Sequence, residues 1–169
     1  MYRRHTRHPV LSLPSLGALA LSLIACFAIS GLGGAITAGP VKSWYPTLAK
    51  PALTPPDLAF PIVWTLLYAL MAIAAWLVWR SAGLRRARGA LTMFGIQLLL
   101  NLAWSALFFG LQRPDLALAE IAILWAAIAT TATLFWRHDR RAALLLAPYL
   151  AWVSFAVWLN AAIWWLNPA

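Results

Sequence analysis

Charged residues are scarce in this chain of 169 residues. They make up 10% of it, only four of them are acidic, and 63% of the residues are hydrophobic. A soluble domain is nearer half apolar and a quarter charged, so it has too little polar surface to cover such a composition. The composition therefore excludes an ordinary water-soluble domain. It predicts a protein that folds in lipid, as a single domain.

Cysteine and histidine are almost absent. The single cysteine, Cys26, lies in an apolar run, so no disulfide framework can form within the chain. His5, His8 and His138 all lie in basic segments outside the long apolar runs. We therefore expect no metal site and no histidine ligand for a haem iron inside the protein. The sequence also has no Ser-His-Asp arrangement and no glycine-rich phosphate loop, so no catalytic constellation is visible.

The few charges are strongly one-sided, with 13 Lys and Arg residues and a formal net charge of +9. A basic balance is common in nucleic-acid-binding proteins, where the basic residues line one face. Here they form short clusters between long apolar runs. We therefore predict no nucleic-acid partner and interpret the charge as a signal that orients the chain in a bilayer.

Long hydrophobic runs are what the chain does contain. A helix needs about 20 apolar residues to cross a bilayer, where it must satisfy its own backbone hydrogen bonds. The stretches of that length are residues 10–37, 58–79, 90–110, 116–136 and 142–166. We predict an all-α integral membrane protein with a bundle of five transmembrane helices over residues 10–169, after a basic tail at 1–9. The first stretch is too long for a signal peptide and lacks a clear cleavage site, so we expect it to be retained.

The basic residues separate by side of the predicted bundle. Most lie before the first span, between the second and third, and between the fourth and fifth. The opposite side carries only Lys42, Lys50 and Arg113. Short loops rich in Lys and Arg stay in the cytoplasm. The pattern predicts a cytoplasmic amino terminus in a bacterial inner membrane, with an outer or organellar membrane left open.

Proline is concentrated in residues 38–57, between the first two spans. The segment contains Pro40, Pro46, Pro51, Pro55 and Pro56. Proline fixes one backbone angle and denies helix continuation, so we predict a stiff loop that is non-helical for much of its length. Loops of this length are often functional, and both a lid over a binding site and a plain connector remain open interpretations.

Three spans carry polar and aromatic side chains at spacings of three and four residues, which place them on one face of each helix. These are Trp64, Tyr68 and Met71 in the second span, Gln97, Asn101, Trp104 and Phe108 in the third, and Tyr149, Trp152, Ala156, Asn160 and Trp164 in the fifth. Polar groups are costly in lipid and mark either helix contacts or a site. For Gln97 and Asn160 we prefer interhelical hydrogen bonding. Trp104 and Trp152 lie deeper and favour a pocket, whereas interfacial anchoring stays open for Trp64.

Glu120 is the only carboxylate well inside a predicted span. It lies near the amino-terminal end of its helix, where the helix macrodipole favours negative charge. We prefer to interpret it as an acid tolerated near the interface, and the alternative is a ligand contact or a proton relay.

Several stretches together resemble the translocator protein family, also called the tryptophan-rich sensory proteins or peripheral benzodiazepine receptors. They include WYPTLAKP at residues 44–51, QLLLNLAW at 97–104 and PYLAW at 148–152. The similarity extends over nearly the whole chain apart from the basic tail, and it fits a bacterial member of the family.

The resemblance implies a five-helix bundle, usually a homodimer, that binds porphyrins and other hydrophobic ligands with no obligatory cofactor. The implied pocket lies beneath the first loop, at Trp44, Phe60, Trp64, Trp104, Trp152, Ala156 and Asn160. Tyr68, Gln97 and Asn101, from the polar faces described above, complete the candidate ligand contacts. The resemblance also implies Trp64 and Trp152 as candidates for light-dependent porphyrin breakdown. Sterols and synthetic benzodiazepine-type ligands bind some relatives, but Ala161 and Trp165 stand where the cholesterol-binding relatives have Tyr and Arg.

We therefore predict a membrane receptor or sensor for tetrapyrroles such as protoporphyrin or haem. The ring would stack on Trp64 and Trp152, with its carboxylates near Lys42 and Lys50 and the proline-rich loop closing over it. A light-dependent porphyrin-degrading enzyme and a transporter of porphyrin or sterol-like ligands are the alternatives. Neither internal repeats nor helices broken at midplane are visible, which disfavours the transporter.

Overall fold

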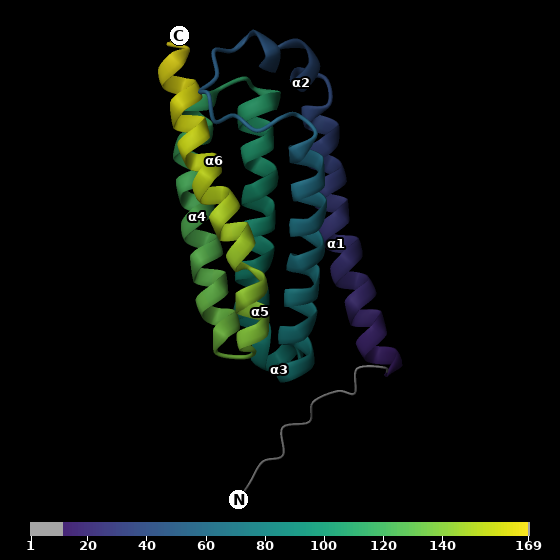
Figure 1. Cartoon of the computed structure of the whole chain (residues 1–169). Coiled ribbons are helices and arrows are strands. Elements are labelled where there is room, and N and C mark those ends of the chain that lie inside the picture. Colours follow the sequence, from purple (N-terminus) through teal and green to yellow (C-terminus); the bar gives the residue numbers. More distant parts are fainter. Residues whose placement is uncertain (1–11, 169) are drawn as a thin grey trace, which may run out of the picture.

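The computed structural model describes residues 12–168, and the predicted basic tail, residues 1–9, lies outside the described residues. The described part is helical and contains no strand. The elements in chain order are α1 (Leu13–Thr37), α2 (Pro40–Ser43), the 3₁₀ turn η1 (Tyr45–Thr47), α3 (Ala59–Ser105), the π-helical turn η2 (Ala106–Gly110), α4 (Pro114–Trp136), α5 (Arg140–Leu145) and α6 (Ala147–Leu166) (Figure 1).

Four helical stretches of the described residues are long and apolar enough to cross a membrane. They are Leu13–Thr37, Ala59–Gly110, Pro114–Trp136 and Arg140–Leu166. The all-α, membrane-spanning class predicted from composition is therefore confirmed. The second stretch has 52 residues, about twice the length of each of the others, because it doubles back on itself.

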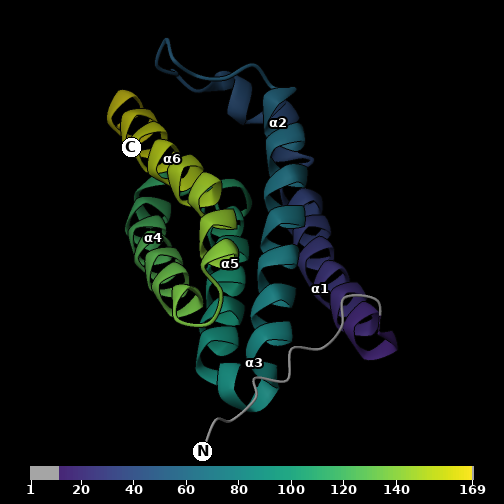
Figure 2. The ribbon, with the colours of Figure 1, turned by 60° about the horizontal axis from the view of Figure 1, so that its bottom comes forward.

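α3 consists of two antiparallel limbs joined at Gly83 (Figures 1 and 2). Gly83 has φ 70° and ψ 164°, a backbone conformation that is essentially restricted to glycine. The two limbs correspond to the predicted spans 58–79 and 90–110. The residues between those spans, 80–89, continue the helix on both sides of Gly83 and form no separate loop.

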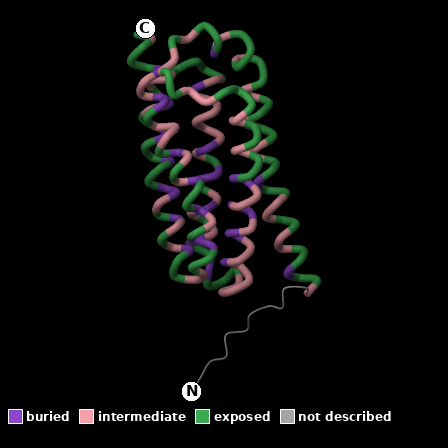
Figure 3. The backbone as a smooth tube through the Cα atoms, viewed as in Figure 1, coloured by how far each residue is buried: buried purple, intermediate pink, exposed green. Residues whose placement is uncertain are grey.

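The core lies between the two limbs of α3 and the helices α4, α5 and α6. Met71, Phe135 and Tyr149 have no exposed surface there. α1 packs against α3 at one edge of the bundle, and its outer face stays apolar and exposed, as at Leu21 and Ile24. Buried residues therefore follow the inner faces and exposed ones the outer faces (Figure 3). Exposed apolar faces are expected when lipid is the surrounding solvent.

The loop between α1 and α3 is partly helical. Pro40 opens α2 and Pro46 lies in the first turn of η1, where a missing backbone N–H is tolerated. Residues 48–58 are the longest irregular stretch, and residues 38–39 and 44 are turns. The loop over residues 38–57 is therefore non-helical for much of its length, as predicted, with α2 and η1 as the helical parts.

Candidate functional site

An apolar cavity of about 590 Å³ lies at the loop end of the bundle, a volume typical of small-molecule sites. Its wall is formed by residues of α1, the loop, both limbs of α3, η2 and α6. Its aromatic lining consists of Tyr45, Phe60, Trp64, Tyr68, Trp104, Phe108, Phe109, Trp152 and Phe155. Ala156 and Asn160, both predicted pocket residues on α6, also line it.

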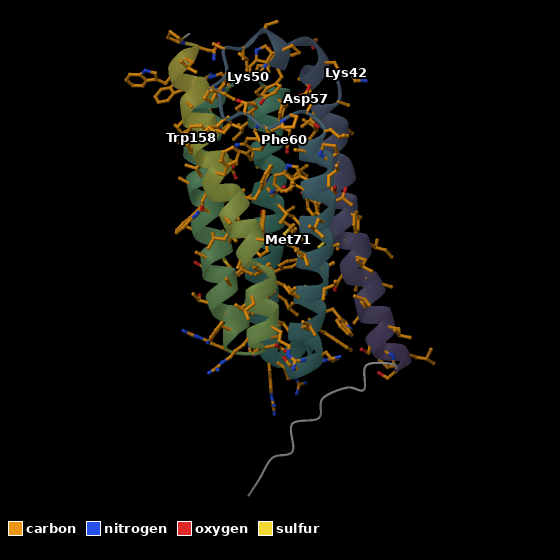
Figure 4. The ribbon with its side chains drawn as sticks, viewed as in Figure 1. Lys42, Lys50, Asp57, Phe60, Met71 and Trp158 are labelled. Atoms are coloured by element: carbon orange, nitrogen blue, oxygen red, sulfur yellow. The ribbon has the colours of Figure 1, made fainter. Side chains whose placement is uncertain are left out.

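The aromatic rings of the wall pack against one another. Trp104 stacks on Phe108 with ring centroids 5.1 Å apart. Phe60, which lies beneath the loop in Figure 4, meets Trp152 edge to face at 5.9 Å. Trp64 lines the same cavity from the first limb of α3. The fold thus brings the predicted tryptophans of α3 and α6 to one cavity, although they are far apart in the sequence.

The floor of the cavity is polar. The Tyr68 hydroxyl donates to Asn101 Oδ1 at 2.6 Å, and Asn101 Nδ2 donates to the Tyr149 hydroxyl at 3.0 Å. Tyr68 and Asn101 line the cavity, whereas Tyr149 is fully buried behind them. This chain of hydrogen bonds links the two limbs of α3 to α6. It is the part of the wall best suited to bind a polar group of a ligand.

Asn160 holds a second polar link. Its Oδ1 accepts from Trp104 Nε1 at 3.0 Å, and its Nδ2 donates to the Pro114 carbonyl at 2.8 Å. Asn160 therefore makes the interhelical hydrogen bonds expected of it while also lining the cavity. These bonds fix the plane of the Trp104 indole at the wall.

Gln97 and Glu120 do not line the cavity. Gln97 is buried below it, beside Met71, which lies at mid-height in Figure 4. Gln97 Nε2 lies 3.8 Å from Met71 Sδ. Glu120 is 9% exposed, and its carboxylate oxygens have no hydrogen-bond partner among the described residues. Gln97, which the sequence analysis included among the candidate ligand contacts, therefore lies outside the cavity wall, as does Glu120.

The rim carries charges of both signs. Lys42 and Asp57 line the cavity at the loop end (Figure 4). Lys50 does not line it, because its ammonium donates to the Tyr45 carbonyl at 2.7 Å and lies 4.5 Å from the centre of the Tyr45 ring. Burial raises the pKa of the Tyr45 hydroxyl, and the negative charge of Asp57 raises it further, so this hydroxyl stays neutral. Of the two lysines expected near ligand carboxylates, only Lys42 faces the cavity.

Trp44 and Trp164 also lie outside the cavity wall. Trp44 packs edge to face on Phe108, with ring centroids 5.7 Å apart, and this contact holds the loop against η2. Tyr45, which the sequence did not single out, takes the lining position in place of Trp44. Trp164 is 45% exposed, so the predicted stripe of α6 leaves the cavity before it reaches this residue.

Fold and site together define an α-helical integral membrane protein with an aromatic cavity beneath a structured loop. Residues 20–166 match the model of the TspO/MBR family, and the chain belongs to that family. The resemblance inferred from the sequence motifs is therefore confirmed.

Several curated relatives match over most of their length. The chain is 44% identical over 154 residues to "Tryptophan-rich protein TspO" of Chlorobaculum tepidum, covering 89% of this chain and 96% of the relative. It is 42% identical to the protein of the same name from Archaeoglobus fulgidus, covering 88% and 96%. It is 33% identical to human "Translocator protein", covering 89% and 88%.

Proposed function

We propose that this protein is a membrane receptor or sensor that binds tetrapyrroles, and other flat hydrophobic molecules, in the cavity beneath the loop. The observation that carries the proposal is the meeting of Trp64, Trp104 and Trp152 in one apolar cavity with a polar floor. The names of the relatives, tryptophan-rich sensory protein and translocator protein, support a receptor role.

The proposed ligand lies with its ring between Trp64 and Trp152. Each stacked aromatic pair contributes about 0.5–1.5 kcal/mol beyond simple burial. Lys42 at the rim is placed to pair with a carboxylate, and Tyr68 with Asn101 to bind a polar group at the floor. No histidine, cysteine or methionine is among the described residues that line the cavity. In this proposal, shape and stacking hold the ring of the porphyrin or haem.

The test is a protoporphyrin titration followed by the absorbance of the pigment. Because two stacked pairs are lost, Trp64→Leu combined with Trp152→Leu is expected to weaken binding by about 1–3 kcal/mol, roughly 5- to 150-fold. Trp165→Leu is the matched control, because Trp165 is 82% exposed on the same helix and should leave the affinity unchanged. Equal affinities of the double variant and the wild type would overturn the placement.

A light-dependent porphyrin-degrading activity is the second candidate. Trp64 and Trp152 both line the cavity, so a bound photosensitiser would lie beside two oxidisable indoles, with molecular oxygen as the oxidant. Illumination of the complex should then produce a new pigment that free porphyrin does not give. If the spectra of bound and free porphyrin change identically under light, the protein only binds. No feature of the described helices favours the transporter.

We also propose that the chain crosses the membrane five times, with each limb of α3 as one span. Both limbs exceed the roughly 20 residues that a crossing requires. Clustered arginines at the Gly83 end support a cytoplasmic location of that end in a bacterial inner membrane. The extensive exposed apolar surface of α1 is compatible with the homodimer that the family resemblance implies.

A further inference from the structure

We propose that hydrophobic ligands reach the cavity sideways from the bilayer, through the seam between the first limb of α3 and α6. In this proposal Trp152 and Phe155 form the gate. The inference rests on the proposed function, since it concerns how a ligand of the central cavity enters and leaves.

A second hollow, about 530 Å³ in volume, lies along this seam. Its lining is apolar throughout and consists of Pro55, Val63, Leu66, Leu67, Pro148, Ala151, Trp152 and Phe155. Leu66 is 59% exposed, so the groove opens on the outer surface of the bundle, which faces lipid. A groove of this composition suits the apolar ring of a membrane-dissolved ligand and offers little polar surface to water.

Only side chains separate the groove from the central cavity. Trp152 and Phe155 line both hollows, and their ring centroids are 5.9 Å apart. The backbones do not close the seam, because α6 makes few close contacts with α3. The shorter helix α5, in contrast, packs directly against α3. Rotation of two aromatic side chains is therefore enough to join the hollows, a motion far faster than a rearrangement of helices.

The loop end, in contrast, is fastened. Ala49 N donates to Asn167 Oδ1, and Asn167 Nδ2 donates to the Ala49 carbonyl, both at 2.9 Å. This pair of hydrogen bonds ties the loop to the end of α6. Tyr45 adds a second attachment, since it is buried with its ring centroid 5.8 Å from that of Phe109. Entry beneath the loop would break both attachments, whereas entry through the seam breaks neither.

The experiment blocks the groove without touching the cavity. Ala151→Trp fills the groove of the full-length protein in lipid vesicles, and stopped-flow absorbance follows the association and dissociation of protoporphyrin. Both rate constants should fall together, by roughly tenfold if the bulky ring adds about 1.4 kcal/mol to the barrier. The equilibrium affinity should not change, because an obstructed path alters both directions equally. Leu66→Trp, on the opposite wall of the groove, is the second variant if Ala151→Trp does not fold.

Two controls separate the routes. Ala126→Trp adds the same ring to an exposed position of α4, away from the seam, and should leave both rates unchanged. Asn167→Leu removes the paired hydrogen bonds to the loop, and the association rate should again stay unchanged, because the loop is not the route.

The outcomes are distinguishable. The lateral route is overturned if the groove variants bind and release protoporphyrin at wild-type rates. It is also overturned if Asn167→Leu associates faster while the groove variants are not slowed. A groove variant that lowers the affinity without lowering both rate constants acts on the binding site itself, and this result also overturns the lateral route. Absence of equilibrium binding to the wild type overturns the proposed function itself, and the route with it.

Discussion

At the residue scale, Asn101 decides how the cavity is joined to the core. Its side-chain oxygen accepts from Tyr68, which lines the cavity, and its nitrogen donates to the fully buried Tyr149. No other amide of the described residues serves both tyrosines. Asn101 therefore has a double role as the partner of both tyrosines, and it also lines the cavity, which the helical spacing of Asn101 and Trp104 indicated only in part.

Replacement of Asn101 tests this double role. Asn101→Leu keeps the approximate volume but removes both hydrogen bonds, so we expect a loss of about 1–3 kcal/mol of stability. Tyr68→Phe removes only one hydroxyl and should cost about 1 kcal/mol or less. Thermal unfolding of the two variants in the same detergent provides the measurement. Equal losses would contradict the dual role.

At the scale of elements, the reversal of α3 depends on one glycine. Gly83 has a positive φ, whereas Gly89 lies in regular helix six residues later. An added Cβ would meet no other atom within 4 Å at either site. The two glycines therefore differ in backbone conformation and not in available space.

Alanine at each glycine separates these effects. Gly83→Ala should destabilise the protein by about 1–3 kcal/mol, because a side chain is strained in this conformation. Gly89→Ala should be neutral or stabilising by up to about 1 kcal/mol, since alanine is the better helix former. Denaturant unfolding in detergent measures both. A Gly83→Ala protein as stable as the Gly89→Ala protein would show that the turn tolerates a side chain.

At the scale of the whole molecule, the arginine clusters and the cavity lie at opposite ends. The Gly83 end carries the arginines of α3 and α5, and two of them lie over tryptophan rings: Arg80 over Trp76 at 4.7 Å and Arg140 over Trp136 at 5.3 Å. Tryptophan and arginine together are typical of the interface of a membrane with water. The cavity lies at the other end, where Lys42, Tyr45 and Asp57 of the loop line it.

The proposed orientation predicts which end an impermeant thiol reagent can label. In a Cys26→Ala background, Ser43→Cys in the loop should be labelled in intact cells, whereas Leu84→Cys should be labelled only after the inner membrane is opened. Both positions are exposed, so their accessibility within the protein is comparable. The reverse pattern would contradict a cytoplasmic Gly83 end.

The sequence by itself determined the membrane class, the positions of the long helices and the faces that carry Trp64, Tyr68, Trp104 and Trp152. These features are readable because hydrophobic length and spacings of three and four residues are local properties of a chain. Local spacing also identified Asn160, whose hydrogen bonds lie across the bundle.

Only the tertiary structure decided which of these side chains share a wall. It put Tyr45 in the cavity in place of Trp44, turned Lys50 back onto the loop, left Gln97 below the floor, and paired Ala49 with Asn167. Each outcome depends on contacts between segments distant in sequence, up to 118 residues apart for Ala49 and Asn167. A helical period gives the direction of a side chain about its own axis, but the neighbour it meets is fixed by how the helices pack.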